Sequence, residues 1–220
     1  MKYIFFAAFL AVSAVHLYGS YKKDAKIRAK TKGFIVLALA GFYFFSADKP
    51  EPITVAALLA SCLGDVLLIK KGVRWFAAGG VSFAISHIFF ILSYYPYIVF
   101  EKLSVPFIAA TSLAYFIASV VIFRALSTRI PKKLFVPMLG YLLVNGAMNM
   151  FALMQFLTKA CLASGIALAG AVLFFISDAL LFFLHFHKAN EIQKSHFKVM
   201  LTYIAAEFLI TEGLILMQNS

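Results

Sequence analysis

The sequence predicts an all-α protein, a polytopic bundle of about eight transmembrane helices that forms a single domain over residues 1–220. Hydrophobic residues make up 63% of the chain and charged residues only 13%, and the mean hydropathy is +0.93. A soluble domain needs more polar surface than this composition provides. The apolar residues also fall into separate stretches that approach the length needed to cross about 30 Å of hydrocarbon. The segments between these stretches are short, so no soluble domain is expected.

Eight apolar stretches can be assigned to helices in chain order. Pro50 and Pro52 mark the turn after the second stretch, and Pro131 lies just before the sixth. The second stretch is the shortest and reaches full length only with its flanks, so seven helices are the alternative. The expected helices cover residues 3–18, 33–47, 53–69, 75–95, 105–123, 134–157, 159–184 and 197–217.

Most of the 20 Lys and Arg residues fall in every second connection between these helices. By the positive-inside rule these connections are cytoplasmic, and both termini are expected on the non-cytoplasmic side. The net charge of +11 then reflects topology and attraction to anionic lipid, so no nucleic-acid partner is expected. A bacterial inner membrane and a eukaryotic internal membrane both fit. The basic connections span residues 22–32, 70–74, 124–133 and 188–198.

Two aspartates lie inside apolar helices, Asp65 in ASCLGDVLLI and Asp178 in AGAVLFFISDALLFFLHF. A charged side chain at that depth costs several kcal/mol unless it is paired, protonated or used in chemistry. Two carboxyl groups in one low-dielectric cavity do not both ionise readily, so one can donate a proton while the other accepts one from water. Asp65 and Asp178 are therefore the predicted catalytic pair, with acid and base left unassigned.

Further polar side chains recur at helical spacing. In the sixth stretch Tyr141, Asn145 and Asn149 are four residues apart, and the eighth stretch repeats the pattern around Glu207. Their depth predicts one shared cavity that opens toward the cytoplasm, although the two asparagines also suit hydrogen bonding between helices. The residues predicted to position substrate or water are His87, Asn145, Tyr203 and Glu207.

The chain resembles the YhhN-type family of lysoplasmalogenase-like integral membrane proteins from Lys26 to Leu216. Each of the segments that carry the resemblance is weak alone, but together, in this order and spacing, they are specific. They are GDVLL at 64–68, GVSFAISH at 80–87, GAVLFFISDAL at 170–180, and Thr202-Tyr203 followed by Ala206-Glu207.

The resemblance implies an eight-helix enzyme that hydrolyses the vinyl ether bond of lysoplasmalogen, with ethanolamine or choline as the head group. The products are a fatty aldehyde and a glycerophospho head group, and Asp65 and Asp178 correspond to the family's catalytic aspartates. This chain departs from the family at Glu207, where Gln is common, and at Phe90, where an aromatic hydroxyl is common.

The expected partner is thus a lysophospholipid in the bilayer. Lys70, Lys71 and Arg74 are close to Asp65 in sequence and are predicted to contact its phosphate. No cofactor or metal ion is expected, because no HExxH or His-rich helix is present. Two alternatives stay open: a proton- or cation-coupled transporter or lipid-handling protein that uses the same carboxyls, and a metal-dependent hydrolase of an amide lipid.

Overall fold

Eight α-helices make up the bundle in a computed structural model that describes residues 1–186 and 195–219. Each helix coincides with one of the predicted stretches, so the all-α prediction and the helix number are confirmed for these residues. Short 3₁₀ turns, η1 (Tyr95–Tyr97), η2 (Phe100–Lys102) and η3 (Lys132–Leu134), flank α5. The helices are α1 (Lys2–Tyr21), α2 (Ala25–Ser46), α3 (Pro52–Leu67), α4 (Val73–Tyr94), α5 (Val105–Leu126), α6 (Phe135–Thr158), α7 (Leu162–Phe186) and α8 (Ser195–Gln218).

Six of these helices are long and apolar enough to cross a membrane, namely all except α2 and α3. α3 is apolar but has only 16 residues, which corresponds to about 24 Å at 1.5 Å per residue. α2 has 22 residues, but its first turns are basic. The protein is therefore a multi-pass membrane protein. Two consecutive helices differ from the rest, α2 because it is less apolar and α3 because it is shorter.

The start of α2 differs from the sequence prediction, which placed residues 22–32 in a connection. The helix begins at Ala25, because the Asp24 carboxylate accepts hydrogen bonds from two backbone N–H groups of the first turn, at 2.8 and 3.1 Å. Basic side chains fit on such a helix because their aliphatic stems cover apolar surface while their charges reach outward. Because α2 begins at Ala25, Lys32 lies two turns inside the helix.

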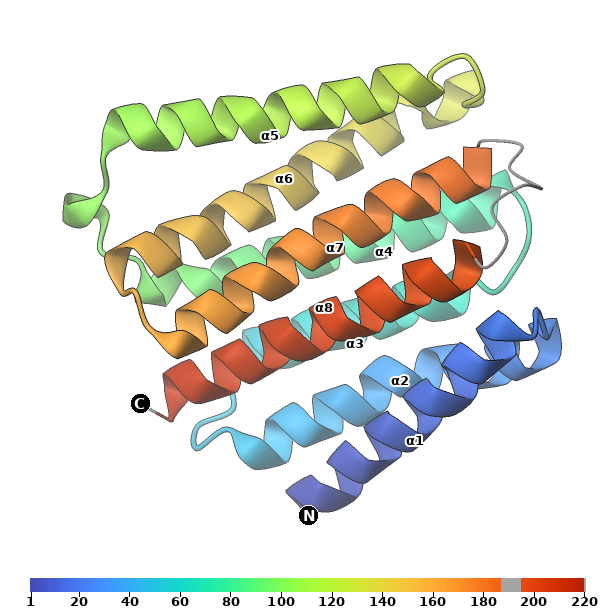
Figure 1. Cartoon of the computed structure of the whole chain (residues 1–220), viewed down its shortest axis with the longest axis horizontal. Coiled ribbons are helices and arrows are strands. Elements are labelled where there is room, and N and C mark those ends of the chain that lie inside the picture. The colour runs from blue at the N-terminus through green and yellow to red at the C-terminus, as the bar shows by residue number, and fades with distance from the viewer. Residues whose placement is uncertain (187–194, 220) are drawn as a thin grey trace.

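The helices lie side by side, with α1 and α5 at opposite edges of the bundle (Figure 1). α7 and α8 cross the face nearest the viewer, and α4 and α3 lie behind them. The α1–α2, α3–α4 and α5–α6 connections gather at one end, which carries Lys23, Lys71 and Lys132, and this is named the basic end. Both termini lie at the other end. The predicted basic segment at 188–198 falls largely outside the described residues.

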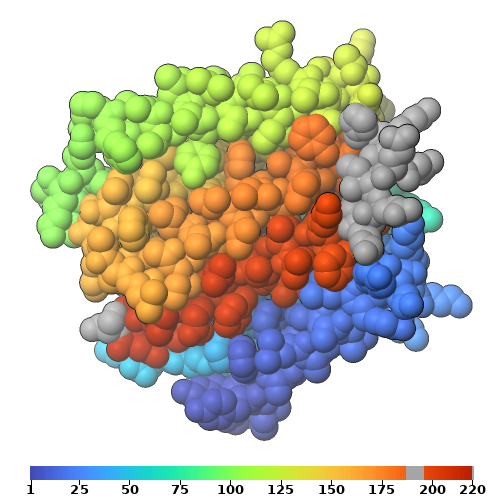
Figure 2. Space-filling model, viewed as in Figure 1, coloured from blue at the N-terminus to red at the C-terminus, as the bar shows by residue number. Residues whose placement is uncertain are grey.

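Close packing of α7 against α8 depends on glycine. A Cβ added to Gly170 would lie 2.7 Å from the backbone nitrogen of Ile210 and 2.9 Å from the carbonyl oxygen of Ala206. Small residues at such positions let two membrane helices approach closely. The space-filling view shows α8 in contact along its length with α7 on one side and the N-terminal helices on the other (Figure 2). This contact fixes the α8 residues that face the interior.

Replacing Gly170 with Ala is expected to lower the free energy of unfolding by about 1–3 kcal/mol, because the new methyl group meets backbone atoms that cannot move aside. Thermal unfolding in detergent measures the effect. Gly80→Ala is the matched control, since a Cβ at Gly80 has nothing within 4 Å and alanine favours the helix. Equal effects of the two substitutions would contradict this account of the α7–α8 contact.

Hydroxyl groups connect α3 to α4 inside the bundle. The side-chain oxygens of Thr54 and Ser93 lie 2.9 Å apart, and those of Ser61 and Ser86 lie 2.8 Å apart. Both pairs are buried, where a hydrogen bond between membrane helices contributes about 0.6 kcal/mol on average. Because the two pairs are seven residues apart on each helix, they fix the rotation of α3 and α4 toward the interior.

Candidate active site

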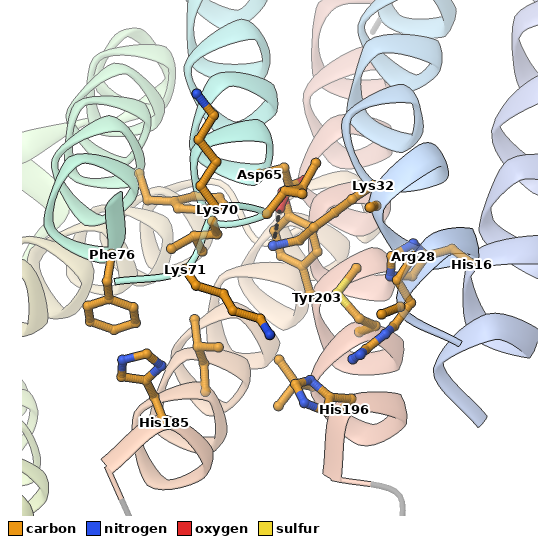
Figure 3. Close-up of a pocket in the computed structure, with 18 of the residues that line it drawn as sticks. His16, Arg28, Lys32, Asp65, Lys70, Lys71, Phe76, His185, His196 and Tyr203 are labelled. Atoms are coloured by element: carbon orange, nitrogen blue, oxygen red, sulfur yellow. Dashed lines mark hydrogen bonds and ion pairs between the residues drawn. The ribbon is translucent and has the colours of Figure 1, made fainter. Parts of the chain in front are cut away.

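A cavity of about 420 Å³ lies near the basic end, between α2, α3, α4, α7 and α8. Asp65, Asp178 and Tyr203 line it, so the two predicted catalytic carboxyls share one cavity. Figure 3 shows Asp65 and Lys32 on the inner side, Arg28 on one flank and Phe76 on the other. The cavity thus joins buried acids to a basic rim.

Asp65 is buried and has a donor at each carboxylate oxygen. Its Oδ1 lies 3.2 Å from the Lys32 ammonium nitrogen, and its Oδ2 accepts a hydrogen bond of 2.8 Å from the Tyr203 hydroxyl. Lys32 comes from α2 and Tyr203 from α8, so three helices build this pair of contacts. An ammonium at one oxygen and a hydroxyl at the other both favour the ionised carboxylate.

Asp178 has a different set of partners, gathered on one oxygen. Its Oδ2 accepts a hydrogen bond of 2.6 Å from Asn145 Nδ2 and a short one from the Tyr141 hydroxyl. Its Oδ1 has no hydrogen bond within residues 1–186 and 195–219, and the side chain lines the cavity. Asp178 therefore keeps one carboxyl oxygen available to hold a proton at the cavity wall.

His87 lies behind Asp178. Its Nδ1 is 2.6 Å from the carbonyl oxygen of Phe83, and because a carbonyl only accepts hydrogen bonds, this nitrogen carries a proton. Its Nε2 is 3.7 Å from Asp178 Oδ2. The ring is completely buried and packs edge-on against Phe174, with 4.6 Å between ring centres. His87 thus presents a fixed ring nitrogen to the back of the carboxyl group.

The amide of Asn145 is oriented by Asn149, one turn further along α6. Asn149 Nδ2 donates to the backbone carbonyl of Asn145 at 3.0 Å and to its Oδ1 at 3.1 Å. With Oδ1 accepting, the Asn145 nitrogen points to Asp178. The polar stripe predicted on α6 therefore serves Asp178, and Tyr141 at the start of the stripe is one of its two hydrogen-bond donors.

The prediction of one polar cavity shared by all these residues is only partly right. Among the predicted residues, Asp65, Asp178 and Tyr203 line the cavity, whereas His87, Asn145 and Glu207 are completely buried behind it. Helical periodicity identifies the inward face of a helix, but the depth at which the cavity ends depends on how the helices pack. The buried residues consequently act through the two aspartates or deeper in the core.

Lys32 and Tyr141 contact the aspartates directly and were missing from the predicted site. The sequence does indicate Tyr141 as a site residue, because it lies four residues before Asn145 in the polar stripe of α6. Nothing in the sequence indicates Lys32, because it was assigned to a connection and not to a helix that faces Asp65.

The basic rim of the cavity also differs from the prediction. Lys70 and Lys71 line the cavity as expected, but Arg74 does not, and Arg28 from α2 lines it instead. The Lys70 ammonium lies 3.9 Å from the centre of the Trp75 ring, which is a cation–π contact. Figure 3 shows Lys70 pointing away from the cavity centre, while Lys71 and Arg28 point toward the same space. These two residues can hold an anion between them.

No group of three His, Cys, Asp or Glu side chains in the described parts of the chain is placed to hold a metal ion. The polar side chains around the cavity are two carboxyls, a tyrosine and a serine hydroxyl, three imidazoles (His16, His185 and His196) and the Lys and Arg groups, and apolar side chains complete its wall. Such a set can transfer protons, stabilise a developing positive charge and bind an anion.

The sequence model of the YhhN family matches residues 27–214. This chain belongs to the YhhN family. The matched range of this YhhN protein begins in α2 and ends in α8, so it contains Lys32, Asp65, Asp178 and Tyr203. Neither the curated proteins nor the solved structures include a significant match. The family assignment agrees with the resemblance found in the sequence.

Proposed function

We propose that this YhhN protein hydrolyses the vinyl ether bond of a lysoplasmalogen to a fatty aldehyde and a glycerophospho head group. The observation that carries the proposal is the pair of aspartates in one cavity with unlike partners. Asp65 has a donor on both oxygens, one of them an ammonium, whereas Asp178 has donors on Oδ2 alone. General acid–base catalysis needs such an asymmetric pair.

The contacts support Asp178 as the acid and Asp65 as the base. A protonated carboxyl group donates a proton from one oxygen and accepts hydrogen bonds at the other. In Asp178, Oδ1 is available to carry the proton, and Oδ2 accepts the hydrogen bonds of Tyr141 and Asn145. The Lys32 ammonium at 3.2 Å from Asp65 favours its ionised form, which is the form a base needs. The proton of Asp178 is then the one transferred, and Asp65 supplies the negative charge.

In the proposed reaction, Asp178 protonates the vinyl ether carbon that is not bonded to oxygen. The carbon bonded to oxygen becomes an oxocarbenium ion, and the carboxylate of Asp65 stabilises this cation. Water attacks the cationic carbon and gives a proton to Asp65, which forms a hemiacetal. The hemiacetal breaks its bond to the glycerol oxygen while the proton of its hydroxyl group passes to that oxygen, so that an alcohol leaves and the aldehyde is released. Return of the proton from Asp65 to Asp178 completes the cycle.

The phosphate of the head group is proposed to lie between Lys71 and Arg28 at the rim. Both side chains point into the cavity from opposite walls, α2 and the α3–α4 connection. Guanidinium and ammonium groups form charge-assisted hydrogen bonds to phosphate oxygens. Arg74 was predicted for this role and is replaced by Arg28, because it does not line the cavity. By the positive-inside rule the rim would face the cytoplasm.

Replacing Lys71 or Arg28 with Ala is expected to raise KM for the lysophospholipid by about 10-fold or more, because a charge-assisted hydrogen bond to phosphate is lost. kcat should change by less than about 3-fold, since neither residue contacts the reacting carbons. Steady-state aldehyde release measures both constants. Arg74→Ala is the control and should leave KM unchanged; a larger effect at Arg74 than at Lys71 and Arg28 would contradict this binding site.

The proposed function is tested with purified protein in detergent and lysoplasmenyl-ethanolamine as substrate. Aldehyde and the glycerophospho head group should be released from it. The acyl lysophospholipid of equal chain length, whose hydrolysis would give a fatty acid, should release no head group. The reaction should not require a sealed vesicle, unlike transport, and a chelator should not stop it. Failure of well-folded protein to release aldehyde would refute the proposal.

A further inference from the structure

A second set of polar groups lies behind the cavity, in the centre of the bundle. It is named the inner polar cluster, and every member is completely buried. One or more side-chain polar atoms of each member lack a hydrogen-bond partner in the described parts of the chain. These atoms are His87 Nε2, Tyr94 hydroxyl, Asn149 Oδ1, Glu207 Oε1 and Oε2, and Thr211 Oγ1.

Glu207 supplies the carboxyl group of the cluster. Ser61 and Tyr203 lie beside its carboxyl group. The Ser61 hydroxyl shares a hydrogen bond with Ser86 in which either oxygen can donate, and the Tyr203 hydroxyl donates to Asp65. The Tyr94 hydroxyl is within electrostatic reach of the same carboxyl. Thr211 follows Glu207 by one turn on α8, which puts both on one face of the helix.

The cluster is connected to both aspartates from the interior side. Tyr203 lies between Glu207 and Asp65, to which it donates its hydrogen bond. On the other side His87 Nε2 faces Asp178 Oδ2 at 3.7 Å, and Asn149 orients the amide that donates to Asp178. A small molecule bound in the cluster would therefore meet the catalytic pair from behind.

Polar atoms without partners are costly in the interior of a membrane protein, where every such group needs an internal partner. Most of the unpartnered atoms are acceptors, namely carboxyl oxygens, an amide oxygen and a ring nitrogen, and the others are hydroxyls that both donate and accept. Water donates two hydrogen bonds and accepts two, and buried water commonly satisfies such groups.

We propose that the inner polar cluster binds ordered water and supplies the molecule that attacks the oxocarbenium ion. This inference rests on the proposed function in one respect, the use of the water. A lysophospholipid bound with its phosphate at Lys71 and Arg28 enters the cavity through the basic rim and displaces solvent there. Water held behind Asp65 and Asp178 stays available when the substrate is bound.

Hydration of the cluster is tested without substrate by X-ray radiolytic hydroxyl labelling, which modifies side chains next to bound water. Tyr94 should be labelled although it is completely buried. Phe9 is the control, because it is equally buried but packs on apolar groups such as Phe208. Labelling of Tyr94 at the level of Phe9 or below would overturn the proposal.

The sign of a stability change gives a second test. Thr211→Val keeps the side-chain shape and removes the unpartnered hydroxyl. If that hydroxyl binds water, Thr211→Val should lower the unfolding temperature by about 2–4 °C. Thr54→Val is the reference variant and should have the same sign, because it removes the hydrogen bond that Thr54 forms with Ser93. In a dry interior, removal of an unpartnered hydroxyl would raise the unfolding temperature instead, and opposite signs for the two variants would overturn the proposal.

The use of the water is tested at Glu207. Glu207→Gln keeps two groups that bind water and should retain kcat within about 3-fold, whereas Glu207→Leu should lower kcat by about 10-fold or more with little change in KM. Equal kcat for the two variants would overturn the supply of water by the cluster. The labelling and stability tests need no substrate, so they are decided even if the protein releases no aldehyde.

Discussion

Asp178→Asn is expected to lower kcat for aldehyde release by about 10²–10⁴-fold, the contribution of a positioned general acid. Asparagine keeps the shape and still accepts the hydrogen bonds of Tyr141 and Asn145 at one oxygen, so the packing is preserved. What it lacks is the transferable proton. The measurement is single-turnover aldehyde release with saturating protein, which isolates the chemical step from substrate binding.

The control for this variant is Glu212→Gln, which neutralises a carboxyl of α8 that does not line the cavity. Its rate should equal that of the unmodified protein. Both variants need an unchanged unfolding temperature before their rates are compared. An Asp178→Asn protein that is well folded and keeps more than a tenth of the rate would remove Asp178 from the mechanism.

Lys32→Met is expected to have the largest effect on stability. It leaves the buried carboxylate of Asp65 without its counter-charge, and breaking a buried ion pair from one side costs about 3–5 kcal/mol. The Lys32 side chain is 17% exposed and that of Asp65 only 2%, so water reaches the lysine side alone and the effect should be near the lower figure. Thermal unfolding in detergent should show a midpoint about 6–12 °C lower.

The double variant Lys32→Met/Asp65→Asn separates this explanation from loss of packing. With both charges removed, at least half of the lost stability should return, because the uncompensated charge is gone. Lys30→Met is the matched control: Lys30 lies on the same helix, is exposed and has no ion pair among the described residues. A double variant no more stable than Lys32→Met would show that the pair does not carry the effect.

The helices were predictable because each leaves a local signal in the sequence. A stretch of 15 to 25 apolar residues has one stable conformation in hydrocarbon, where backbone groups need partners within the segment. That Asp65 and Asp178 have polar partners was predictable for a similar reason, since a carboxyl inside such a stretch is unfavourable without a partner or a role. Neither inference requires knowledge of which helices are neighbours.

The partners of the two aspartates were not predictable in this way. Lys32 pairs with Asp65 across 33 positions of sequence, and Tyr203 reaches the same carboxyl across 138. Helical periodicity gives the face on which a residue lies, but the neighbour of that face depends on packing of the whole bundle. The sequence predicted Arg74 at the rim, but the structure places Arg28 there. The reason is the same, because Arg28 is on α2, which reaches the cavity from a distant part of the chain.

The ion pair between Lys32 and Asp65 also bears on biosynthesis. Each charge alone would oppose entry of its helix into the membrane, by about 2.5–3.5 kcal/mol at the helix centre. α2 and α3 are also the two helices that fall short of the length or composition of an independent span. Consecutive helices leave the ribosome together, and a lysine on one can neutralise an aspartate on the next before either is surrounded by lipid. We therefore expect this salt bridge to let α2 and α3 enter the bilayer together as one hairpin.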